Sequence, residues 1–151
     1  MIAVSAEDTL CFEEGTTFTI TTVTPSGNTT GTWVYDVVAT ASDASVTGYT
    51  QHADEVGLTF TDNLVNSSNT LQWVDYEFTA KILNPRTGLP YCTDGVIDTT
   101  IRIWINPEPM IEVSVEDTLC FEEGTTFTIT TTTPSVNTTG TWVYDLSLIH
   151  I

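Results

Sequence analysis

The chain of 151 residues carries 20 Asp and Glu against three Lys and Arg, which gives a formal net charge of −17. Nucleic acids and anionic membrane surfaces are bound through clusters of Lys and Arg, so this composition argues against both as partners. No segment approaches the roughly 18 apolar residues of a membrane-spanning helix, so we expect no membrane insertion. An apolar content of 40% is enough to build a folded core.

Alternation of apolar and polar residues predicts β-strands along the whole chain, and no stretch shows the period of a helix. The apolar positions of these runs are, in chain order, Ile2, Val4 and Ala6; Phe18 and Ile20; Trp33, Val34 and Tyr35; Val56, Leu58 and Phe60; Val74, Tyr76, Phe78, Ala80 and Ile82; and Ile97, Ile101, Ile103 and Ile105. Turn-forming residues separate the runs, for example between Asn84 and Gly88.

About seven such strands in about 105 residues predict an all-β fold, a two-sheet Greek-key sandwich. A single sheet would leave one apolar face in water, so two sheets must close on each other. Trp73 and Trp104 fall on the faces opposite the apolar positions, so we expect them on the outside of the sandwich.

Residues 110–145 nearly repeat residues 1–36, with 32 of the 36 aligned positions identical. The stretch DTLCFEEGTTFTITT occurs unchanged at 8–22 and at 117–131. The resulting period of 109 residues is the size of a whole domain. We therefore expect a complete sandwich in residues 1–109 and the first strands of a second, truncated copy in residues 110–145.

The match ends after Asp145, where the second copy continues as LSLIHI. This hexapeptide is what CTG TCT CTT ATA CAC ATC encodes, which resembles a transposase adapter used in sequencing libraries. We predict that residues 146–151 are a read-through artefact of that kind, with a genuine divergent strand as the alternative. Met1 aligns with Met110 inside the repeat, so the absence of a signal peptide says nothing about secretion.

Each period contains two cysteines, Cys11 and Cys92, and Cys120 is the copy of Cys11. Two cysteines per domain favour a disulfide formed in an oxidising compartment. A Cys11–Cys92 bridge would close a loop of about 80 residues and stabilise the domain by roughly 4–5 kcal/mol. A Cys92–Cys120 bridge across the junction and free thiols are the alternatives.

The segment Asn106-Pro107-Glu108-Pro109 joins the two copies, and each proline restricts itself and the residue before it to extended conformations. Such a joint is stiff and would hold successive sandwiches end to end. Each sandwich would then add about 35–40 Å, since a strand rises about 3.3 Å per residue.

This junction resembles that of a known family. The strand that ends in Ile103-Trp104-Ile105-Asn106-Pro107-Glu108-Pro109, followed by an alternating strand, Asp117-Thr118-Leu119-Cys120 and Gly124, is similar to the "VNPLP … ICSGE" pattern of PKD-like repeats. Tyr91-Cys92-Thr93-Asp94-Gly95 resembles the "GCTG" turn of the same repeats, which occur in large cell-surface and secreted proteins of Bacteroidota. The chain departs from the family at Phe121-Glu122-Glu123, where small residues are usual. The resemblance implies an immunoglobulin-like β-sandwich in tandem array, export to the cell exterior, and a role in adhesion or gliding.

Few residues are candidates for chemistry, and we expect no enzyme, because His52 stands alone and no Ser or Cys occupies a nucleophile motif. Carboxylates gather at two turns, where they could bind Ca²⁺ and stiffen an array; they are Glu7, Asp8, Glu13 and Glu14 at the first turn, and Asp94 and Asp98 at the last. No D-x-D-x-D-G loop is present, so solvated carboxylates are the simpler interpretation and no cofactor is expected. Trp73 and Trp104 could stack on sugars, or they could cover a sheet edge or a domain contact.

These features together predict a non-catalytic structural or adhesive repeat, a rigid spacer in a large bacterial surface or secreted protein. Its partners would be the neighbouring repeats of the same chain, together with surface glycans or proteins. The alternatives are a carbohydrate-binding module that uses Trp73 and Trp104, and an accessory domain of a secreted polysaccharide-degrading enzyme.

Overall fold

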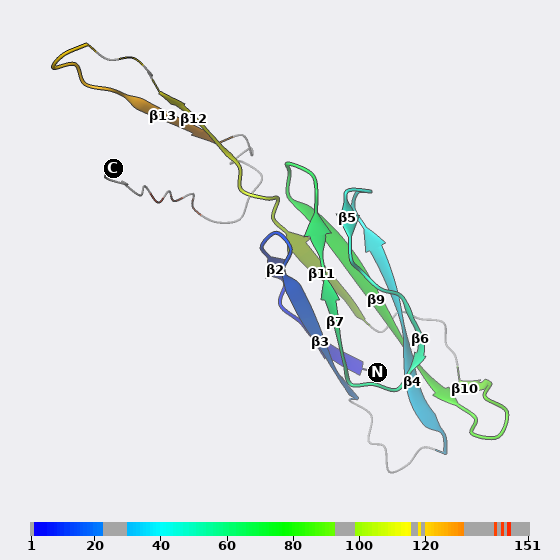
Figure 1. The fold of residues 1–151 in the computed structure, drawn as a ribbon. Coiled ribbons are helices and arrows are strands. Elements are labelled where there is room, and N and C mark those ends of the chain that lie inside the picture. Colours follow the sequence, from blue (N-terminus) through cyan, green and yellow to red (C-terminus); the bar gives the residue numbers. More distant parts are fainter. Residues whose placement is uncertain are drawn as a thin grey trace.

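The structure, a computed structural model, describes residues 2–22, 30–92, 99–115, 118, 120–131, 141, 143 and 145, without the side chains of Thr22 and Cys92. All regular elements in this part of the chain are β-strands, and they form a two-layered sandwich, as the alternation predicts (Figure 1). With no helix among them, the described residues offer none that could cross a membrane. Residues 146–151, predicted to be an artefact, lie outside the described residues.

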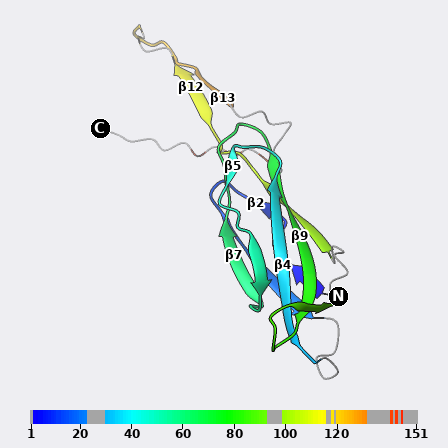
Figure 2. The ribbon, with the colours of Figure 1, turned by 90° about the vertical axis from the view of Figure 1, so that its right-hand side faces the viewer.

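The sandwich consists of two main sheets, which Figure 2 shows from the side. The first has the order β1–β3–β7, with β1 Ile2–Ser5, β3 Gly15–Thr22 and β7 Thr59–Asn63. The second has the order β2–β11–β9–β4–β6, with β2 Thr9–Leu10, β11 Thr99–Ile105, β9 Gln72–Leu83, β4 Thr32–Ala41 and β6 His52–Glu55, and β10 Pro90–Cys92 also pairs with β9. The short strands β5 Val46–Thr47 and β8 Val65–Asn66 pair with each other. The first ten residues thus contribute to both sheets, because β1 pairs with β3 in the first sheet and β2 pairs in parallel with β11 in the second.

The core lies between the two sheets and is centred on aromatic rings. Phe18 is fully buried, and its ring lies 4.5 Å from the rings of both Phe60 and Tyr76. Most of the predicted inward positions of β3, β9 and β11 are confirmed as buried, namely Phe18, Ile20, Val74, Tyr76, Phe78, Ile103 and Ile105. The remaining ones in the described strands, Ala80, Ile82 and Ile101, are only half-buried. Burying each such side chain stabilises the fold by about 1.5–3 kcal/mol.

The alternating run at 56–60 is only partly a buried strand. Strand β7 begins at Thr59, and Val56 and Leu58 remain 66% and 62% exposed. Leu58 still takes part in the backbone network, since its carbonyl accepts a hydrogen bond of 2.8 Å from the N–H of Ile20. The prediction of burial from the period-two pattern was therefore wrong for these two side chains, which both precede the start of β7.

The chain enters and leaves the sandwich at opposite ends. Strand β11 ends at Ile105 beside Leu10, and the N–H of Asn106 donates to the Leu10 carbonyl at 3.0 Å; we call this the distal end. Strand β1 begins at Ile2, which pairs with Thr22, and we call this the proximal end. Thr22 lies seven residues along β3 from the turn next to Leu10, a separation of about 23 Å.

The second copy forms the same hairpin as the first. Strands β12 Ile111–Val115 and β13 Phe127–Thr131 pair antiparallel, and the pair Ile111–Thr131 corresponds to Ile2–Thr22. In Figure 1 this hairpin lies beyond the distal end of the sandwich. Its apolar side chains are about half exposed, at 50% for Ile111, 52% for Val113, 47% for Val115 and 56% for Phe127. The hairpin therefore follows from local sequence, whereas burial of its apolar face requires a facing sheet.

Candidate functional site

Four side chains meet on the outer face of the six-stranded sheet, near the distal end. In the register of β11 and β9, Trp104 lies opposite Trp73 and Arg102 lies opposite Asp75. Successive residues of a strand point to opposite faces, and the intervening Ile103 and Val74 are fully buried. Both tryptophans are half-buried on the outer face, where the sequence predicts them. We call these four residues the Trp–Arg cluster.

The Trp–Arg cluster is held together by Arg102. Its Nε and Nη2 atoms each donate a 2.7 Å hydrogen bond to the Asp75 carboxylate, a two-pronged geometry that suits the planar guanidinium. The guanidinium carbon lies 4.9 Å from the centre of the Trp73 ring and 5.5 Å from that of Trp104. The hydrogen bond from Arg102 lowers the pKa of Asp75, and the same bond raises the pKa of Arg102.

This geometry limits how a sugar could bind. The two indole rings are 5.1 Å apart and inclined at 57°, so they do not form one flat platform. The guanidinium lies over both rings, where cation–π attraction holds it. A sugar ring that stacked between them would have to displace Arg102 from Asp75. As folded, the cluster is a packed surface feature.

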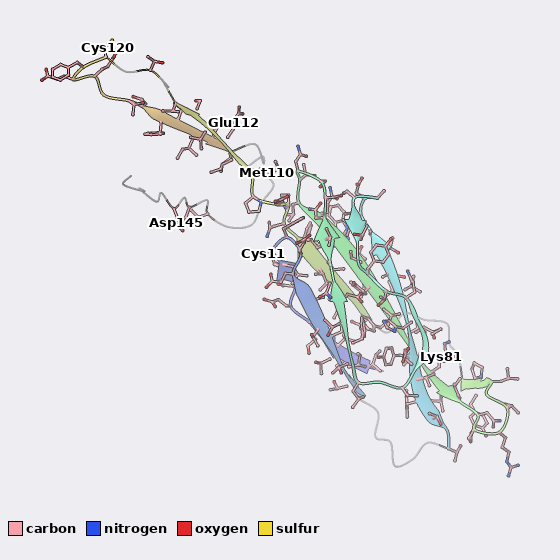
Figure 3. The ribbon with its side chains drawn as sticks, in the orientation of Figure 1. Cys11, Lys81, Met110, Glu112, Cys120 and Asp145 are labelled. Carbon is pink, nitrogen blue, oxygen red and sulfur yellow. The ribbon has the colours of Figure 1, made fainter. Side chains whose placement is uncertain are left out.

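A second ionic group lies toward the proximal end of the sandwich, where Figure 3 labels Lys81. The ammonium group of Lys81 pairs with Asp36 and, at 3.2 Å, with Asp54. The hydrogen bond to Asp36 is the main cause that raises the pKa of Lys81. Lys81 and Arg102 are two of the three basic residues of the chain, so their charges are balanced by carboxylates and form no basic patch.

One buried carboxylate ties the two layers together. Asp62 is 2% exposed and accepts hydrogen bonds from the Tyr76 hydroxyl at 2.6 Å and from the Thr50 N–H and hydroxyl at 3.0 and 2.7 Å. Burial raises the pKa of Tyr76, and the bond to Asp62 raises it further. The alternating pattern does not predict this network, because Asp62 and Tyr76 belong to different sheets.

The sequence suggests that His52 stands alone, but in the structure it has two polar neighbours. Its Nε2 lies 2.9 Å from the Thr50 hydroxyl oxygen and its Nδ1 lies 3.4 Å from Glu55. The Thr50 hydroxyl donates its only proton to Asp62, so it accepts from the imidazole and is not activated as a nucleophile. Through Thr50, this arrangement connects His52 of β6 to Asp62 of β7, which is a structural role.

The predicted Cys11–Cys92 bridge is wrong. Cys11 follows Leu10 at the distal end, level with the start of β9 at Gln72. Cys92 pairs with Ile82, ten residues further along the same strand and so about 33 Å away. A disulfide requires Cα atoms within about 7 Å. Cys11 accordingly has a free thiol. The sequence spacing does not show that Cys11 and Cys92 lie at opposite ends of the sandwich.

The alternative bridge between Cys92 and Cys120 is excluded by the same reasoning. Figure 3 shows Cys120 at the far tip of the β12–β13 hairpin, beyond the distal end where Cys11 lies. Cys92 pairs at the proximal end of β9, so the whole sandwich separates the two cysteines. Cys120 is free and exposed, like Cys11.

The structure does not assemble the proposed calcium ligands of the first turn. In the part of the chain that it describes, no three His, Cys, Asp or Glu side chains lie close enough together to hold a metal ion, which applies to Glu7, Asp8, Glu13 and Glu14. The Glu14 carboxylate instead accepts the N–H of Cys11 at 2.8 Å. Asp94 and Asp98 lie outside the described residues.

A hollow of about 340 Å³ lies at the distal end, and sequence reasoning missed it. It is lined by Phe12, the loop of residues 66–69, Glu108 and Met110. These segments lie far apart in sequence and meet only because β11 ends beside Leu10. The sole signal in the sequence was the unchanged Phe within the repeated turn.

Comparisons with protein-family models, with curated proteins and with solved structures found no match for this chain.

Proposed function

We propose that residues 1–109 form a non-catalytic spacer repeat, strung end to end with further copies in a large bacterial surface or secreted protein. The observation that carries this proposal is the placement of the chain ends. The polypeptide enters at Ile2 on the proximal end and leaves at Asn106 on the distal end. A following copy therefore continues away from the first, which is the connectivity that a stalk needs.

The exit of the chain is firmly held, which supports a spacer role. Buried Asn66 donates from Nδ2 to the carbonyl of Ile105 at 3.0 Å, and Asn106 donates from both N and Nδ2 to the Leu10 carbonyl at 3.0 and 3.2 Å. Pro107, the next residue, is buried. The linker thus leaves the sandwich in a fixed direction before the second proline is reached.

The length of each unit follows from its longest strand. Strand β9 has 12 residues, which corresponds to about 40 Å. A row of such units projects whatever it carries far from its anchor. The net charge of −17 keeps chains of this kind soluble and apart, and suits a cation-rich exterior.

Small-angle X-ray scattering on one repeat and on two repeats joined by the natural linker tests this function. The maximum dimension should grow by about 40 Å with the second repeat. Replacing Pro107 and Pro109 by Gly should broaden the distance distribution without unfolding either repeat. A second repeat that adds less than about half a strand length would show that the units fold back, and the spacer proposal would fail.

Carbohydrate binding is the second candidate, and the adjacency of Trp73 and Trp104 on one outer face is what favours it. Residues 1–109 should be applied to a glycan array together with the variants Trp73→Ala and Arg102→Ala. The spacer proposal predicts no retention for any of the three proteins. Retention that is lost in Trp73→Ala would instead establish a sugar site, and stronger retention in Arg102→Ala would show that the guanidinium blocks it.

A further inference from the structure

The turn that contains Phe12 is built in the same way in both copies. The Glu14 carboxylate accepts the backbone N–H three residues before it at 2.8 Å, and Glu123 does the same at 2.9 Å. The intervening Glu13 and Glu122 both adopt the left-handed region, with φ of 57° and 61°. The conformation of the turn is therefore a local property of the repeated sequence.

The phenylalanine of this turn has different surroundings in the two copies. Phe12 is half-buried and lines the distal hollow together with Glu108 and Met110 of the linker region. Phe121, its copy, is 93% exposed. Because the turn itself is the same, the difference comes from the segments around it: the 66–69 loop and the linker line the hollow with Phe12, and the second copy has no counterpart of either beside Phe121.

The linker reaches Phe12 because the distal end directs it there. Asn106 is bonded to the carbonyl of Leu10, two residues before Phe12, and Pro107 is buried. On the other side of the hollow, the loop of residues 66–69 is fixed by Asn66, whose Oδ1 accepts from the N–H and hydroxyl of Ser68 at 3.0 and 2.7 Å. The hollow therefore has one aromatic wall, one polar wall and the outgoing chain between them.

We propose that Phe12 and the 66–69 loop form a docking site for the start of the next repeat of the same chain, with Met110 as its first occupant. The prolines of the linker fix their own φ and restrict the residue before each of them to extended conformations, but the ψ angles of the prolines themselves can still vary, so they alone do not set the angle between two repeats. Met110 lines the hollow with Phe12 and is 55% exposed, and in this proposal its packing against the Phe12 ring removes that freedom. The remaining space of the hollow takes a further side chain from the proximal end of the following copy, and Phe121 would serve the repeat after it in the same way. This inference rests on the proposed spacer function, since it explains how consecutive units keep a fixed angle.

The chain has only two methionines, Met1 and Met110, which makes a direct test simple. The whole chain would be labelled with ¹³C at the methionine methyl groups and observed by NMR, with Met1 as the internal reference. The Met110 methyl should be shifted upfield by the Phe12 ring and should show a nuclear Overhauser effect to it. Both signals should be lost in Phe12→Ala. In Phe12→Leu the upfield shift should also be lost, but a weaker nuclear Overhauser effect from the Met110 methyl to the leucine methyl groups should remain.

Phe121→Ala provides a matched control, because it removes the same side chain from the same turn at a position without a linker beside it. It should leave the Met110 methyl signal unchanged, and the amide spectrum of residues 2–105 should report an intact sandwich in every variant. If the Met110 methyl shows no contact with Phe12 in the unaltered chain, or responds equally to both alanine variants, the docking site is refuted. The scattering experiment on two repeats remains independent of this result, so loss of the docking site would leave the elongated arrangement to be judged separately.

Discussion

The buried bond between Tyr76 and Asp62 should make a large and separable contribution to stability. The Tyr76→Phe substitution removes one hydroxyl from a fully buried ring and leaves the ring packing on Phe18 in place. Asp62 then loses its 2.6 Å donor but keeps two donors from Thr50. A hydrogen bond to a charged group contributes about 1.5–3 kcal/mol. Because Thr50 still donates two hydrogen bonds to the carboxylate, we expect the free energy of unfolding to fall by about 1.5–2 kcal/mol.

The Asp62→Ala substitution should cost more, because three donors lose their acceptor at once. They are the Tyr76 hydroxyl and the N–H and hydroxyl of Thr50, and a buried group left without a partner costs about 1–3 kcal/mol, less for a hydroxyl that can turn to another acceptor. We expect a loss of about 3–4 kcal/mol for this variant, and less than the sum of the single losses for the double variant. Chemical unfolding of residues 1–109 in urea, followed by tryptophan fluorescence, measures all three free energies of unfolding.

Tyr91→Phe is the control, since Tyr91 is 52% exposed on β10 and should change stability by no more than about 0.5 kcal/mol. In thermal melts the Tyr76→Phe loss corresponds to a fall in Tm of roughly 10 °C for a domain of this size. If Tyr76→Phe falls within about 0.5 kcal/mol of the unaltered protein, or if the two substitutions are additive, the buried network does not stabilise the fold as argued.

Three further outcomes are expected. Dithiothreitol should leave the urea midpoint of residues 1–109 unchanged, whereas a Cys11–Cys92 bridge would make reduction cost roughly 4–5 kcal/mol, and non-reducing peptide maps should contain no such pair. The pKa of Asp75 is lowered in the folded state, so its ion pair with Arg102 stabilises the fold above the unfolded pKa of about 3.9, and this stabilisation is lost as the pH falls through the lower folded value. In Asp75→Asn the free energy of unfolding should therefore fall less steeply with decreasing pH in the acid range. An unchanged dependence on pH would speak against the pair. Residues 110–145 alone should show no cooperative melt by circular dichroism while residues 1–109 do, because a two-stranded hairpin with a half-exposed apolar face is marginal in water.

The strand pattern carried much of the fold. Alternation correctly placed Phe18, Tyr76 and Ile103 in the core and Trp73 and Trp104 outside, because side chains on a strand alternate between the two faces. The pattern could not show the parallel pairing of β2 with β11, since two residues are too few to leave a periodic signal. For Leu58 it predicted a buried position, but this residue precedes β7 and is 62% exposed.

The sequence alone determined the two-layer β character, the side of the sheet that each strand residue takes, and the identical turns and hairpins of the two copies, because these depend on neighbours within a few residues or on a simple period. The tertiary structure alone decided at which end each segment lies. It separated Cys11 from Cys92, joined Asp62 to Tyr76, and placed Phe12 and Met110 on the lining of one hollow. The physical reason is that period two reports the face of a side chain, whereas its level along the sandwich depends on strand register, which long-range pairing fixes.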